Sequence, residues 1–110
     1  MTAYFLLLST FARAEILLPR AVVTQHLTEA RDCYVSRVKQ GLTKEGRLVI
    51  SWTINEQGQA VAPKSRLNEL GDAKLYDCLA EKIKTWKFSP SEKSKIQNFL
   101  FPFIFRLKEN

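Results

Sequence analysis

The chain has 110 residues, of which 45% are hydrophobic and 25% are charged, and its formal net charge is +6. This length suits one domain, and this composition is typical of a globular protein and excludes an intrinsically disordered one. The lysines are spread along the sequence, which favours solvated helix faces over a nucleic-acid-binding surface.

The first fourteen residues resemble a targeting segment. An apolar run begins at Ala3 and ends in Ala12-Arg13-Ala14, a small-x-small pattern suited to signal peptidase. The run is about ten residues long, well short of the roughly 20 that span a bilayer. We therefore expect a signal peptide at residues 1–14, an exported domain at residues 15–110 and no transmembrane anchor. The alternatives are an internal strand or a misassigned start.

Residues 19–39 have the period of an amphipathic helix. Its apolar stripe consists of Val23, Leu27, Ala30, Tyr34 and Val38. Pro19 suits the first helical turn, and Gly41 can end the helix. His26 lies near the edge of the stripe, so we expect it at the surface or boundary and not as a ligand.

Two strands should follow. Residues 46–54 alternate strictly, with one apolar face made of Leu48, Ile50, Trp52 and Ile54. Asn55 and Gly58 are suited to a hairpin turn. Residues 59–67 form a weaker strand that is interrupted by Pro63, and proline confines a strand to the edge of a sheet.

A second helix should begin at Asp72, a good N-cap, and end in Trp86-Lys87-Phe88. Its apolar stripe consists of Leu75, Leu79, Ile83 and Trp86, and its densest cluster of basic residues is Lys82, Lys84 and Lys87. Cys33 and Cys78 each lie mid-helix beside an apolar stripe. Because an exported chain enters an oxidising compartment, we expect them to form one disulfide; the alternative is that each is a small buried hydrophobe. With His26 they make only three soft ligands, so we expect no metal.

The last strand is predicted at residues 98–105. Its four phenylalanines, Phe99, Phe101, Phe103 and Phe105, occur at alternate positions and should share one face. Pro102 again indicates an edge strand. The element order predicts an α+β two-layer sandwich, in which two helices cover one face of a three-stranded antiparallel sheet. The strand at residues 46–54 should be central.

The ordered set of Gly46-Arg47, Asn55-x-x-Gly58, Trp86-Lys87-Phe88-x-Pro90 and Pro102-Phe103-Ile104-Phe105 resembles the TonB C-terminal domain superfamily. Cys33-Tyr34 and Cys78 make the two-cysteine AgmX/PglI-type domain the closer resemblance. The resemblance implies a periplasmic or secreted, non-enzymatic domain that captures a peptide segment of an envelope or outer-membrane protein by strand addition. It places partner binding at the last strand, at Ile96, Asn98, Leu100, Pro102, Ile104 and Arg106.

Other functions are weaker predictions. A structural or anionic-surface-binding component of an envelope assembly would use the basic helix residues. Catalysis has little support, because the single histidine has no evident partner and no two carboxylates are spaced to converge. We expect no cofactor and no nucleic acid, and an exposed edge strand also permits a homodimer.

Overall fold

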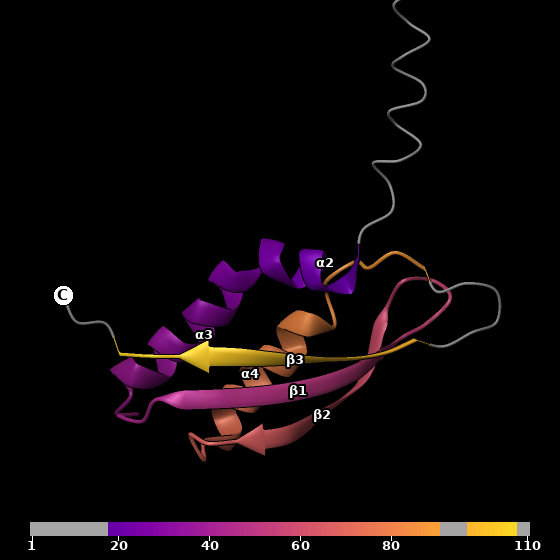
Figure 1. Ribbon diagram of the computed structural model, residues 1–110. Coiled ribbons are helices and arrows are strands. Elements are labelled where there is room, and N and C mark those ends of the chain that lie inside the picture. The colour runs from indigo at the N-terminus through magenta and orange to yellow at the C-terminus, as the bar shows by residue number, and fades with distance from the viewer. Residues whose placement is uncertain (1–17, 91–96, 108–110) are drawn as a thin grey trace, which may run out of the picture.

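The computed structural model describes residues 18–90 and 97–107. In chain order its elements are α2 (Pro19–Gln25), α3 (Leu27–Lys39), β1 (Gly46–Ile54), β2 (Ala60–Asn68), α4 (Ala73–Ile83) and β3 (Gln97–Phe105). Figure 1 shows α2 and α3 running along β3. In the same view α4 crosses behind the strands of the sheet. The α+β prediction is confirmed. The proposed signal peptide and Ile96 lie outside the described residues.

The sheet is antiparallel with strand order β2-β1-β3, so β1 is central as predicted. Its alternating apolar side chains are fully buried against the helices, because successive side chains of a strand point to opposite faces. β3 pairs with β1 at every position from Gly46↔Phe105 to Ile54↔Gln97 without a register shift. β3 is therefore a regular edge strand.

β2 is the other edge strand and is irregular. Its pairing with β1 shifts twice, between Val49 and Ile50 and between Ser51 and Thr53. Ala62 lies at φ 54°, in the left-handed region, next to Pro63, the residue that was predicted to interrupt this strand. The Tyr76 hydroxyl of α4 donates a 2.8 Å hydrogen bond to the Pro63 carbonyl. Bulges and proline disfavour pairing with a further strand along β2.

The first helix differs from the prediction, because residues 19–39 form two helices and not one. The helix is interrupted at His26, which has φ −112° and ψ 14° and separates α2 from α3. His26 is half-buried, as expected, and stacks on the Trp86 ring with 4.8 Å between centroids. Its Nδ1 lies 2.8 Å from Glu29, which also accepts a 2.8 Å hydrogen bond from Trp86 Nε1. These contacts stabilise the break.

The hairpin turn is confirmed. The Asn55 side-chain oxygen accepts hydrogen bonds from the backbone N–H groups of Gln57 and Gln59. Gly58 lies at φ 80°, and a Cβ there would come within 2.2 Å of the Phe88 carbonyl oxygen. Only glycine suits this position, because it accepts a positive φ and leaves room for the second backbone segment.

Asp72 is the N-cap of α4, as predicted, and its carboxylate accepts a 3.1 Å hydrogen bond from the Lys74 N–H. The predicted end of this helix is wrong, since α4 stops at Ile83. Trp86 and Phe88 nevertheless lie in the core, because the chain turns beyond α4 and Gln59 forms an isolated bridge with Lys87.

The disulfide between Cys33 and Cys78 joins α3 to α4, with 5.9 Å between the two Cα atoms. It lies in the helical layer, over a core formed by the buried face of β1, the inward phenylalanines of β3 and the apolar stripes of the helices. Among the described residues, no helix is long and apolar enough to cross a bilayer.

Candidate functional site

The predicted partner-binding residues fall on one side of β3. Asn98, Leu100, Pro102 and Ile104 take alternate positions of the strand, and Arg106 follows its end. The phenylalanines between them point to the core: Phe101, Phe103 and Phe105 are buried and Phe99 is half-buried. Leu100 and Ile104 are 52% and 58% exposed. The structure therefore separates a core-facing set of β3 side chains from an outward set.

Hydrogen bonds of β1 establish which backbone groups of β3 face outward. The Glu69 N–H donates to the Arg47 carbonyl at 2.9 Å, so the backbone of Arg47 points to β2. Backbone direction alternates along a strand, so the next residue, Leu48, points to β3 and pairs with Phe103. The backbone N–H and C=O groups of Phe103 therefore point to β1. The backbone polar groups of the residues before and after it, Pro102 and Ile104, point away from β1.

The outward backbone row consequently belongs to Asn98, Leu100, Pro102 and Ile104. No described strand pairs with this row. Pro102 has no N–H, and because it occurs in the outward row, its missing donor does not interrupt the β1–β3 ladder. An added strand would find carbonyl acceptors along the whole row and one missing donor at Pro102.

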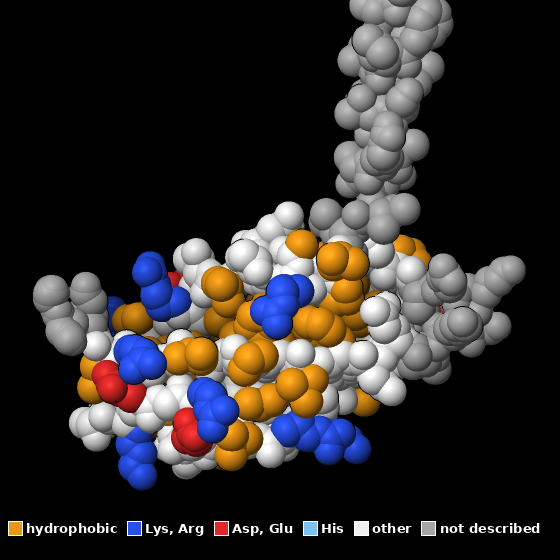
Figure 2. Space-filling view, viewed as in Figure 1, with side chains coloured by type: hydrophobic (Ala, Val, Ile, Leu, Met, Phe, Trp, Pro, Cys, Tyr) orange, Lys and Arg blue, Asp and Glu red, His pale blue; other side chains and the backbone are white. Residues whose placement is uncertain are grey.

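The same residues contribute to an apolar surface on the open face of the sheet. Val49 of β1 stands opposite both Leu67 of β2 and Pro102 of β3. We call the open-face patch the set of Val49, Leu67, Leu100, Pro102 and Ile104. Figure 2 shows hydrophobic side chains on this face, with basic and acidic side chains among and around them. An isolated exposed leucine is ordinary, but a contiguous apolar patch is typical of an interaction surface.

On the opposite side of the outward row, a groove with a volume of about 420 Å³ separates α3 from β3. We call it the β3 groove. α3 contributes Leu27, Ala30, Arg31 and Tyr34, β3 contributes residues 101–105, and Arg106 lies just beyond the strand. The prediction that Leu27 belongs to the buried stripe is wrong: it is 41% exposed and lines this groove. Arg31 of the same helix lies in the groove wall.

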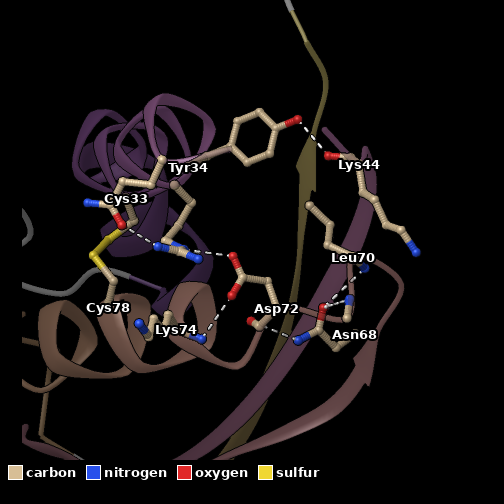
Figure 3. Close-up of polar contacts among 11 residues, drawn as sticks. Cys33, Tyr34, Lys44, Asn68, Leu70, Asp72, Lys74 and Cys78 are labelled. Atoms are coloured by element: carbon tan, nitrogen blue, oxygen red, sulfur yellow. Dashed lines mark hydrogen bonds and ion pairs between the residues drawn. A yellow bond between two sulfur atoms is a disulfide. The ribbon is translucent and has the colours of Figure 1, made fainter. Parts of the chain in front are cut away.

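Tyr34 fixes the position of α3 at the end of the β3 groove. Its hydroxyl donates a 2.8 Å hydrogen bond to the Lys44 carbonyl (Figure 3), and its ring stacks on Phe105 with 4.9 Å between centroids. Burial, and after it the negative charge of Glu45, raises the pKa of the Tyr34 hydroxyl. The hydroxyl therefore stays protonated and remains a donor at neutral pH.

A polar network holds α3 on α4 beside the disulfide. Arg37 Nε donates to an Asp72 oxygen at 2.8 Å, and both side chains are mostly buried. Figure 3 shows Asp72 also bound to the backbone N–H of Lys74 and, through its carbonyl, to the Asn68 side chain. Burial alone raises the pKa of the Asp72 carboxyl, but the hydrogen bonds from Arg37 and Lys74 outweigh it and the net pKa is lowered.

The lowered pKa predicts an acid-sensitive fold. A carboxyl with a depressed pKa in the folded state contributes stability above its unfolded pKa, about 4, and this stability is lost as the pH falls through the folded pKa. As the pH is lowered below about 4, we expect the unfolding free energy of the native chain to fall more steeply than that of the Asp72→Asn variant. Denaturant melts at several pH values measure this. Parallel curves for the two proteins would contradict the assignment.

The basic helix residues do not form the single helix face that the sequence predicted. Lys82 and Lys84 are exposed, but Lys84 Nζ lies 3.4 Å from a Glu81 oxygen and Lys87 lies beyond the end of α4. Among residues 18–90 and 97–107, no group of histidine, cysteine and carboxylate side chains could hold a metal ion.

Comparisons with known proteins give one result for this geometry. No protein-family model matches the chain, and no curated protein matches it. Among solved structures, the solution structure of the Pseudomonas aeruginosa TonB C-terminal domain matches with a TM-score of 0.50 and 18% identity. The match covers 67% of this chain and 77% of that one. The chain thus has a fold similar to that of a TonB C-terminal domain.

Proposed function

We propose that this chain is an exported, non-enzymatic protein-binding module of the TonB C-terminal kind. It captures an extended segment of an envelope protein as a fourth strand beside β3. The observation that carries the proposal is the outward backbone row of β3, which has no strand partner among the described residues. The proposed site consists of Ile96, Asn98, Leu100, Pro102, Ile104 and Arg106.

Strand addition explains the surroundings of this row. Main-chain hydrogen bonds supply affinity in this recognition mode, and side-chain pockets on alternate sides supply specificity. A captured strand would set alternate side chains on the open-face patch and in the β3 groove. The disulfide fits an oxidising compartment, in agreement with the proposed export, and with the two-cysteine variety of the domain.

A proline at Ile104 tests this function. It would remove an outward N–H without touching the β1–β3 ladder, since Ile104 faces away from β1. We expect Ile104→Pro to lose the envelope proteins that the native chain retains on a column, and to keep a native circular dichroism spectrum. The measurement is mass spectrometry of the retained proteins from an envelope extract.

The matched control is Ser65→Pro on the opposite edge. Ser65 stands opposite Ile50, whose backbone points to β3, so the N–H of Ser65 also faces outward. This variant should retain the same proteins as the native chain. If Ile104→Pro retains them as well, or if both variants lose them equally, strand addition at β3 is refuted.

A further inference from the structure

Two arginines lie on the side of β3 that faces the helices, and neither forms an ion pair with another described residue. Arg20 of α2 lies with its guanidinium carbon 5.2 Å from the centre of the Phe101 ring. Arg31 of α3 lines the β3 groove and also an adjoining hollow of about 960 Å³. The described ion pairs are His26–Glu29, Arg37–Asp72, Arg47–Glu69 and Lys84–Glu81, and neither arginine is among them.

The β3 groove, which Arg31 lines, is largely apolar and aromatic, and Arg20 lies over one of its rings, that of Phe101. Ala30, Tyr34 and the rings of Phe101 and Phe103 line the groove. The ring face of Phe101 stabilises the positive charge of Arg20, but it does not replace a carboxylate as an ion-pair partner. Arginine also binds carboxylates with two parallel hydrogen bonds, which suits an acidic side chain lying in the groove.

The opposite side of the outward row has a different chemistry. Leu100 and Ile104 project there into the open-face patch. Because side chains of a strand alternate between faces, a strand added to β3 would meet the arginines at every second residue and the apolar patch at the residues between them. The two sides of the edge therefore demand different residue types.

We infer that the site selects an extended acidic peptide segment that alternates carboxylates with apolar residues. Its carboxylates bind Arg20 and Arg31 on the helix side, and its apolar side chains cover Leu100 and Ile104 on the open face. This inference rests on the proposed strand addition and names the class of segment. Charge complementarity supports an acidic segment over a second copy of this chain, because a second copy would bring its own unpaired arginines to the same edge.

Fluorescence anisotropy with labelled twelve-residue peptides tests the inference. The probes are a peptide that alternates Glu and Val, one that alternates Lys and Val, and one with the same Glu and Val content in blocks of two. We expect the native chain to bind the alternating acidic peptide about tenfold more tightly than either other peptide, because only it places every carboxylate on the arginine side of an added strand and every valine on the side of the open-face patch.

Charge reversal supplies the second arm. The double variant Arg20→Glu and Arg31→Glu should lose the preference for the acidic peptide and bind the lysine peptide more tightly. Lys64→Glu on β2 makes the same type of change away from the groove, and should leave the preference unchanged at matched ionic strength.

The outcomes separate this inference from the proposed function. Equal affinity for all three peptides, sensitive to Ile104→Pro, would overturn the alternating acidic pattern and leave strand addition intact. A preference for acidic peptides that survives the double reversal would also overturn it. Failure of every peptide to bind would count against both the pattern and the capture of a strand at β3.

Discussion

Reduction of the Cys33–Cys78 disulfide should lower the free energy of unfolding by about 4 kcal/mol. The two cysteines are 45 residues apart, so the bridge closes a loop that contains β1, β2 and the start of α4. Closing a loop of this length restricts the unfolded chain, and the loss of entropy accounts for an effect of this size. It is a large share of the roughly 5–15 kcal/mol that stabilises a domain.

Urea denaturation of the oxidised and reduced protein measures this effect. The double variant Cys33→Ala and Cys78→Ala is the control, because it removes the bridge without leaving thiols and should resemble the reduced protein within about 1–2 kcal/mol. An unfolding free energy that changes by less than about 1 kcal/mol on reduction would show that the bridge adds little to the packing of α3 on α4.

Phe103→Ala should destabilise the domain by about 3–5 kcal/mol. Phe103 is 2% exposed, stands opposite Leu48 of the central strand and lies between Phe101 and Phe105 in the aromatic row. Its removal leaves a cavity at the point where β3 packs beneath the helices, and a core of this density cannot collapse to fill it.

Ile104→Ala is the matched control, since Ile104 is the next residue and is 58% exposed. It should change the unfolding free energy by less than about 1 kcal/mol, as exposed substitutions usually do. Thermal or urea melts of both variants give the comparison. Similar losses for the two variants would contradict the separation of an inward and an outward side of β3.

The strands were predictable because their periodicity is unambiguous. Four apolar residues alternate in β1 and four phenylalanines in β3, and a helix would have scattered either set around its axis. The prolines in β2 and β3 predicted the edge positions of these two strands, since a missing N–H is tolerated only where no ladder hydrogen bond is needed. The disulfide was one of two open alternatives until the packing of α3 on α4 brought the cysteines together.

The helix boundaries were harder to predict. A stripe with steps of three and four residues continues through His26, so periodicity alone gives one helix where the chain forms two. The break depends on contacts of His26 with Trp86, a residue distant in sequence. The end of α4 was placed too late for a similar reason: Trp86 is buried like a helical residue but reaches the core from a turn.

The groove wall could not be predicted from any local pattern. Leu27 and Arg31 line the β3 groove because α3 lies along β3, an arrangement that only the assembled fold defines. The periodicity of residues 19–39 assigned Leu27 to the core, and no pattern in the sequence singled out Arg31. The available signal is a leucine and an arginine one helical turn apart, and it is weak.

The two edges of the sheet are unequal, and this limits how copies of the chain can join. A filament in which sheets join edge to edge needs two edges that both accept a strand. β3 is regular, but the pairing of β2 with β1 shifts register twice. When two copies pair through β3, the regular edge of each copy is occupied. Only the two irregular β2 edges then remain exposed. Such growth stops at two copies, and each pair formed occupies the backbone row that a captured segment would need.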